Sequence, residues 1–216
     1  MREHTSTQII AKEGWNYILF FVIVLLLSYF FDFAILFAVV VLLFTIYIFR
    51  NPERLPAEDD ELAILAPCDG VIEKIEKAQF NAKDMIHIKI KKSLFDVSIL
   101  RSPVLMNIHN TQKRHGLFLP LTSKLSKVLG ERVQIEAKSF YSDIVLVINA
   151  GIFSRKIELF KTIGPLKSSQ RFCILVEGSV DLYVALDSRI KVAIADRVRS
   201  GESVLGYFSH KGNLDG

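Results

Sequence analysis

Gly178 and Ser179 are the neighbouring residues with the clearest capacity for chemistry in this 216-residue chain. They lie in a strongly β-prone run, residues 174–183. A serine hydroxyl can attack the carbonyl carbon of the residue before it, and glycine leaves that carbonyl unshielded. The pair is therefore a candidate self-cleavage site. The alternative interpretation is an ordinary turn or bulge in a strand.

The elements that must position this pair are mostly β-strands. Short alternating or apolar runs, punctuated by Gly, Pro, Asn and Asp, predict strands at 70–75, 85–90, 95–100, 133–137, 144–148, 155–159, 172–176, 180–185 and 190–193. Residues 123–130 predict either a short helix or a lid loop. The predicted fold class is mainly β, a β-sandwich or barrel that follows an N-terminal hydrophobic helical hairpin.

Residues 15–49 predict a membrane segment. Asp32 is the one charged residue in this range, and it separates the apolar runs Trp15–Phe31 and Phe33–Phe49. Because each run is close to the lower limit of about 17 residues for a helix that crosses a bilayer, a hairpin fits better than one long span. Whether it spans the bilayer or lies in one leaflet stays open. The flanking basic residues, which favour a cytoplasmic location for both ends, are Arg2, Lys12, Arg50 and Arg54.

The composition of the chain indicates where its domains begin and end and which classes of partner it suits. Two prolines and dense charge at residues 50–60 predict an exposed linker, so we expect a segment with the hairpin at 1–50, a linker at 51–63 and a β domain at 64–216. The 27 basic and 23 acidic residues suit an anionic membrane surface better than nucleic acid. Cys68 and Cys173 lack metal-type spacing, which indicates reduced thiols and no metal site.

Two stretches of the β domain, residues 66–75 and 190–206, are similar to strand-and-turn pieces of biotinyl or lipoyl sandwiches. In those sandwiches Asp-Gly and Ser-Gly set tight turns between short strands. A carrier domain also needs a modifiable lysine between paired hydrophobic residues at a hairpin tip, and the expected tip has none. A carrier function is therefore a runner-up only.

Several pieces occur in a fixed order along the chain. After the apolar hairpin come residues 49–54, 66–70, 95–104 and 150–157, and then Gly178-Ser179 with Val-Asp-Leu-Tyr behind it. In this order they resemble the short, membrane-anchored branch of the phosphatidylserine decarboxylase family. The resemblance covers nearly the whole chain.

The resemblance implies an enzyme that makes its own cofactor. In that family the serine attacks the glycine carbonyl, an ester replaces the amide, elimination leaves dehydroalanine, and hydrolysis yields a covalent pyruvoyl group, here from Ser179. The group acts as the electron sink when carbon dioxide leaves phosphatidylserine, and phosphatidylethanolamine is the product. The implied partners are a phospholipid in the inner (cytoplasmic) membrane, with the β domain on the cytoplasmic side, and the two fragments of one chain. A homo-oligomer is left open.

The resemblance also assigns roles to single residues. Asp69, in the Asp-Gly motif, takes part in self-processing, or else it caps a tight turn. Arg101, before Ser-Pro, meets the lipid carboxylate or phosphate, or else forms a surface ion pair. Ser98 stands where the family has a histidine, which removes the expected general acid or base. His115, in a His-x-Gly-x-Phe stretch, and His109 are the candidate substitutes.

A second departure from the family pattern lies at the cleavage site. The family usually has one residue between the serine and Val-Asp, whereas Val180 follows Ser179 directly, and Glu177 replaces an apolar residue. A slip of one residue in a strand exchanges its faces, so the serine could point away from the pocket. Two functions from different classes remain: a pyruvoyl-dependent lipid decarboxylase, and a non-processing relative that serves as a membrane-attached lipid-binding or scaffold protein.

Overall fold

The fold is that of a computed structural model, which describes residues 10–11, 14–31, 34–57, 60–120, 123–154 and 156–209. The chain divides into two compact units, Met1–Glu53 and Arg54–Gly216. The first contains two of the described helices, and the second contains every described strand and one short helix.

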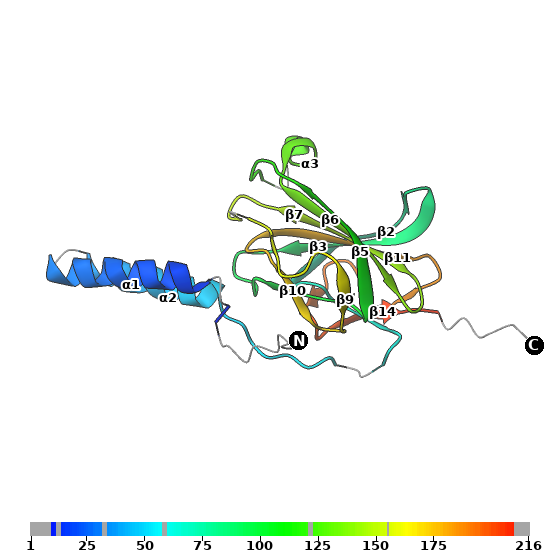
Figure 1. The fold of residues 1–216 in the computed structure, drawn as a ribbon, viewed down its shortest axis with the longest axis horizontal. Helices are drawn as coiled ribbons and strands as arrows, with labels where there is room; N and C mark the ends of the chain where they lie inside the picture. The colour runs from blue at the N-terminus through cyan, green and yellow to red at the C-terminus, as the bar shows by residue number, and fades with distance from the viewer. Residues whose placement is uncertain are drawn as a thin grey trace, which may run out of the picture. The chain divides into compact units, whose positions relative to one another are not determined.

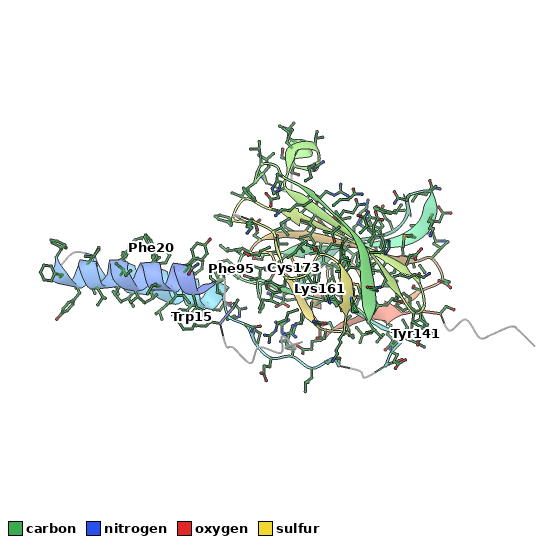
Figure 2. All side chains as sticks on the ribbon, viewed as in Figure 1. Trp15, Phe20, Phe95, Tyr141, Lys161 and Cys173 are labelled. Carbon is green, nitrogen blue, oxygen red and sulfur yellow. The ribbon has the colours of Figure 1, made fainter. Side chains whose placement is uncertain are left out.

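Two helices, α1 (Trp15–Phe30) and α2 (Ile35–Ile48), occupy the apolar runs and lie side by side (Figure 1). Most of their large apolar side chains are exposed; Phe30, for example, is 81% exposed. Figure 2 shows Trp15 and Phe20 projecting from α1. In the described part of the chain, no helix combines the length and the apolar character that crossing a membrane requires. Asp32, Arg2 and Lys12 lie outside the described residues.

One eight-stranded antiparallel sheet dominates the second unit, with the order β13-β2-β3-β11-β7-β6-β5-β9 (Figure 1). Its strands are β2 (Gly70–Phe80), β3 (Lys83–Lys92), β5 (Met106–Arg114), β6 (Arg132–Ser139), β7 (Asp143–Ala150), β9 (Gly164–Leu166), β11 (Gly178–Ala185) and β13 (Arg197–Val198). The strand β11, which begins with the candidate cleavage pair, is central and pairs with both β3 and β7. The predicted mainly β class is confirmed.

Two three-stranded sheets complete the unit. One has the order β1-β14-β12, with β1 (Ala63–Leu65), β14 (Val204–Tyr207) and β12 (Arg189–Ile190). The other has the order β4-β10-β8, with β4 (Ile99–Arg101), β10 (Arg171–Ile174) and β8 (Glu158–Leu159). A single buried apolar cluster joins all three sheets, and it includes Ile64, Leu100, Leu146, Phe172, Leu182 and Leu205. The burial of this cluster is the main favourable term that holds the unit together.

The two stretches compared with biotinyl and lipoyl sandwiches lie next to each other. The strand β13 pairs with β2, so Val198 lies opposite Gly70. The Ile72 amide also donates to the carbonyl oxygen of Asp196 at 2.9 Å. The finer likeness to a biotinyl or lipoyl sandwich stays a prediction.

The strand expected at 95–100 is mostly a turn, and only its last two residues belong to β4. The Asp96 carboxylate accepts the Ser93 amide at 2.8 Å, and the Lys92 ammonium donates to the Asp96 carbonyl at 3.1 Å. These local side-chain bonds replace a cross-strand ladder. The expected strands at 155–159 and 190–193 are reduced to the short β8 and β12.

One long strand, β5, has no counterpart among the expected strands. Its sequence, Met-Asn-Ile-His-Asn-Thr-Gln-Lys-Arg, is too polar for the alternation rule, yet it pairs with β6 along its whole length. Residues 124–129 form the short helix α3 (Lys124–Leu129) rather than a lid loop. The Ser123 hydroxyl caps α3 by accepting the Leu125 amide.

Candidate functional site

The pair Gly178 and Ser179 is fixed at the start of β11. A Cβ atom at Gly178 would lie 2.2 Å from the carbonyl oxygen of Asn149 on β7, so this close approach admits only glycine. Side chains alternate along the strand, and Val180 and Leu182 are buried in the core. Ser179 therefore lies on the other face of the sheet, where it is only 1% exposed.

The Ser179 hydroxyl belongs to a chain of polar side chains on that face. Asn149 Nδ2 donates to Ser179 Oγ at 3.4 Å and to Asp181 Oδ2 at 2.7 Å. The other Asp181 oxygen lies 2.8 Å from His87 Nε2, and His87 Nδ1 lies 3.3 Å from Glu76 Oε1. Since an ionised carboxylate only accepts, the amide nitrogen of Asn149 must be the atom that faces Asp181. We call Ser179, Asn149, Asp181 and His87 the Ser179 cluster.

The pKa of His87 is shifted by the groups around it. Burial acts to lower the pKa of His87, but the hydrogen bonds and charges of Asp181 and Glu76 outweigh it, so this pKa lies above its usual value. The Tyr183 ring stacks on His87 with 4.6 Å between ring centroids. Because both ring nitrogens face carboxylates, only the doubly protonated imidazolium can donate to both.

A second polar group, the Asp69 cluster, consists of Asp69, Arg54, Ser200 and Val97. Arg54 Nη2 donates to Asp69 Oδ2 at 2.8 Å, and Arg54 Nη1 donates to Oδ1. The amides of Ser200 and Val97 donate to Asp69 at 2.8 Å and 3.4 Å. This carboxylate therefore accepts four N–H groups, two of them from a bidentate guanidinium. In the described residues, the two clusters share no member and no hydrogen bond.

The charge of Asp69 is stabilised in place. Burial acts to raise the pKa of Asp69, but the contacts with Arg54 and the Ser200 amide lower this pKa by more, so it lies below its usual value. Burial likewise acts to lower the pKa of Arg54, whereas the bond to Asp69 raises it, and the net shift is upward. Asp69 thus stays ionised and Arg54 stays protonated at neutral pH. The assignment of a self-processing role to Asp69 stays a prediction.

The turn that follows β3 connects the Asp69 cluster to the residues before Ser179. Val97 donates to Asp69, and the carbonyl of the next residue, Ser98, accepts the Leu175 amide at 2.9 Å. Lys92 is 1% exposed, and its ammonium donates to the Val176 carbonyl at 3.0 Å. Ser98 is equally buried. The Ser98 hydroxyl is therefore enclosed in this turn, and its replacement of a family histidine stays a prediction.

Arg101 lies in the same corner of the fold as Asp69. It is 7% exposed, its amide donates to the Pro67 carbonyl at 2.9 Å, and its Nη1 donates to the Ser169 carbonyl at 3.2 Å. The Ser200 hydroxyl donates to the same Pro67 carbonyl at 2.9 Å. Asp69, Ser98 and Arg101 thus gather in one region, and lipid recognition by Arg101 stays a prediction.

The two histidines considered as substitutes for the family histidine lie elsewhere. His115 is exposed in the loop after β5. His109 is exposed on β5, with Nε2 3.9 Å from Glu136 Oε2. In the described part of the chain, neither forms a hydrogen bond or ion pair with Ser179 or Asp69.

Glu177, the acidic residue before the glycine, is held by the loop that follows β7. The Gly151 amide donates to its carbonyl at 3.0 Å, and the Phe153 amide donates to its carboxylate at 3.0 Å. The Ser154 hydroxyl donates to the Glu177 carbonyl and accepts the Glu177 amide. The residues on both sides of the candidate scissile bond are therefore immobilised.

Sequence reasoning missed Arg54, Asn149, His87 and the site role of Asp181. The available signal was period-two alternation, which places Ser179 and Asp181 on one strand face. Asn149 and His87 come from neighbouring strands, and their approach depends on register, which no single segment encodes. In the sequence, Arg54 is recognisable only as a basic residue that flanks the apolar runs.

The sequence profile described as phosphatidylserine decarboxylase matches residues 41–206, which include both clusters. The phosphatidylserine decarboxylase proenzyme of Desulfotalea psychrophila is 31% identical over 205 residues, which cover 91% of this chain and 95% of the relative. The proenzymes of Burkholderia cenocepacia and Geotalea daltonii are each 32% identical, over 91% and 79% of this chain and 95% and 82% of their own lengths. The chain therefore belongs to the phosphatidylserine decarboxylase family.

Proposed function

We propose that this chain is a pyruvoyl-dependent phosphatidylserine decarboxylase that cleaves itself between Gly178 and Ser179. An intact Gly-Ser pair, immobilised from both sides in a chain of this family, is the observation that supports the proposal most directly. Ser179 Oγ would attack the Gly178 carbonyl carbon, and the amide nitrogen of Ser179 would leave as the amine. Elimination would break the Cβ–Oγ bond and release the Gly178 carboxylate, and hydrolysis would then release ammonia.

The surroundings of Ser179 fit a pyruvoyl group. The side chain is buried, and the Asn149 amide that donates to Ser179 Oγ can donate equally well to a carbonyl oxygen at this position. The group supplies an electron sink for the pair of electrons released when carbon dioxide leaves the substrate. Asn149 would orient the reacting end of β11, and the adjoining strands would exclude water from it.

The fragments of a cut chain would remain together. Residues 179–216 contribute all of β11 except its first residue, together with β12, β13 and β14. The strand β11 pairs with β3 on one side and β7 on the other, while β13 pairs with β2 and β14 pairs with β1. Every one of these partners precedes the cut, so separation would require the central sheet to open.

We also propose attachment to the inner membrane through α1 and α2, with the β domain on the cytoplasmic side. The exposed apolar side chains of both helices support this assignment, because such a surface is unfavourable in water. It would bring the enzyme to a phospholipid substrate. Fractionation and flotation of the full chain with anionic phospholipid vesicles test the attachment.

Gel electrophoresis of the purified full chain tests the cleavage. We expect a large fragment of residues 1–178 and a small fragment of residues 179–216, with the small one blocked to Edman sequencing. Its mass should correspond to a pyruvoyl group instead of an N-terminal serine. The matched control is Ser179→Ala, which should stay intact near 24.5 kDa. Formation of phosphatidylethanolamine from phosphatidylserine vesicles then tests the decarboxylation separately.

One observation favours a second function. Position 98 holds a serine where the resemblance predicts a histidine. The Ser179 hydroxyl accepts from the amide of Asn149 and contacts no base among the described residues. A chain that cannot activate Ser179 would serve as a membrane-attached lipid-binding or scaffold protein. It would give one intact band for both the wild type and Ser179→Ala, and both proteins would still float with the vesicles.

A further inference from the structure

We propose that Asn149, oriented by Asp181 and His87, holds and polarises the Ser179 hydroxyl for self-cleavage. The proposal rests on the cleavage proposed above and adds the residues that control it. Asn149 touches the reacting oxygen, so it would act as a catalytic residue, while Asp181 and His87 would act through it as positioning residues. All four side chains lie on the sheet face that points away from the core.

The geometry gives Asn149 a single usable orientation. Its Nδ2 group carries two hydrogens, one directed to Asp181 at 2.7 Å and the other to Ser179 Oγ at 3.4 Å. A flipped amide would place its carbonyl oxygen against the Asp181 carboxylate, where two acceptors repel. Asp181 therefore fixes the donor that faces Ser179.

The donated bond has a chemical consequence for the hydroxyl. Because Ser179 Oγ accepts from Asn149, its own proton points elsewhere, and a water molecule would take it up during the attack. A donor to Oγ stabilises the negative charge on Oγ once this proton is lost, and the attack then moves that charge to the Gly178 carbonyl oxygen. This arrangement would assist a serine that lacks a histidine as general base. This chain has Ser98 at the position where the resemblance predicts that histidine.

His87 makes the arrangement dependent on pH. The charged and titratable groups around it are Glu76 and Lys74 on β2, Lys89 on β3, and Asp181 and Tyr183 on β11. Protonated, His87 donates to both Asp181 and Glu76. On losing its second proton it can donate to only one of the two carboxylates, which releases Asp181 from an ion pair and loosens Asn149.

Cleavage kinetics of the full chain test the proposal. Cell-free synthesis in detergent would supply uncut precursor, and gels would follow the fragments between about pH 5.5 and 8.5, the range in which histidine titrates. We expect Asn149→Ala and Asp181→Asn to slow cleavage about tenfold or more, less than the roughly 100-fold loss of an oxyanion-hole donor because the contact to Ser179 Oγ is 3.4 Å long. The matched surface controls, Asn107→Ala and His109→Gln, should cleave at the wild-type rate.

His87→Gln separates positioning from folding, because glutamine keeps a neutral donor but cannot titrate. The ratio of wild-type to variant rates should be largest at acid pH and approach one as pH rises through the His87 pKa. A ratio that is independent of pH, or an Asn149→Ala variant that cleaves as fast as the wild type, would overturn the proposal while leaving self-cleavage intact. A wild type that is never cut would overturn both.

A measurement on uncut protein checks the network directly. In full-length Ser179→Ala, NMR titration of His87 should give a lower pKa when Asp181→Asn is added, because the anionic partner is lost. An unchanged His87 pKa would contradict the contact on which the positioning depends. Thermal unfolding of each variant would identify any that fail to fold, and Asp181→Glu, which keeps the charge, should restore part of the lost rate.

Discussion

Two aspartates lie near the candidate cleavage pair, and they have different kinds of partner. Asp69 is bound by a guanidinium and two backbone amides. Asp181 is bound by a histidine and a side-chain amide. The donors of Asp69 keep their protons at every physiological pH, whereas His87 titrates. Asp69 is therefore suited to fixing the backbone around the site at any physiological pH. The contacts of Asp181 are suited to changing with pH.

The largest expected effect comes from breaking the permanent pair. Asp69→Asn in the uncut Ser179→Ala chain should lower the free energy of unfolding by about 3 kcal/mol, because it leaves the Arg54 charge buried without its partner. Chemical denaturation followed by circular dichroism measures this change. The exposed control Asp84→Asn should have almost no effect, and equal losses in the two variants would remove the distinction.

A smaller effect is expected when residue 54 keeps its positive charge but loses the two-pronged guanidinium that binds both Asp69 oxygens. Arg54→Lys should cost about 1–2 kcal/mol, because an ammonium cannot bind both Asp69 oxygens in the same planar geometry. The matched control is Arg197→Lys, whose side chain is 75% exposed beside Asp96. If both variants lost the same stability, the bidentate contact of Arg54 would have no special value.

The two aspartate sites should respond oppositely to pH. The lowered pKa of Asp69 means that its contribution to stability is present above its unfolded pKa and lost as pH falls through the folded value. The raised pKa of His87 means that its contribution is complete below its unfolded pKa and lost as pH rises through the folded value. His87→Gln should therefore cost about 1 kcal/mol at acid pH and less at alkaline pH. Denaturation across the pH range measures both trends, and a loss for His87→Gln that grows towards alkaline pH would contradict the assignment.

The smallest expected effect concerns the ring that covers His87. Tyr183→Leu should lower the free energy of unfolding by about 0.5 kcal/mol more than Tyr183→Phe, because phenylalanine keeps the stacked ring and leucine does not. The same pair of variants, compared by NMR, shows whether stacking also affects the His87 pKa. Identical stabilities of the two variants would mean that the stacked ring contributes nothing beyond its apolar volume.

The sequence predicts well those features of the fold that depend on local pattern. The strands around Ile72, Ile88, Val133, Leu146 and Leu182 follow from runs of apolar residues with period two, and these side chains form the core. The polar strand β5 has no such signal, since its pairing with β6 and β9 determines its conformation. The sequence predicts a strand at 95–100 where the structure has a turn, because a pattern of apolar residues does not reveal the hydrogen bonds of Asp96 and Lys92.

Some residues of the candidate site are predictable from local sequence, and others are not. Gly178, Ser179 and Asp69 are recognisable from short motifs, and the structure gives each a defined set of contacts. Two members of the Ser179 cluster come from other strands, Asn149 from β7 and His87 from β3. Asn149 is 30 residues from Ser179 in the chain, so strand register alone brings the two together. Ser179 lies on the sheet face opposite the core, and the one-residue slip at this serine stays a prediction.

The central position of β11 has a further consequence for the history of each molecule. An uncut chain folds as one molecule, with both halves at a fixed effective concentration. Once the bond between Gly178 and Ser179 is broken, refolding would require two separate chains to meet, and the shorter one would have to insert between β3 and β7. Cleavage would thus leave the native sheet in place but make its loss irreversible, so the mature protein would persist by slow unfolding rather than by equilibrium stability.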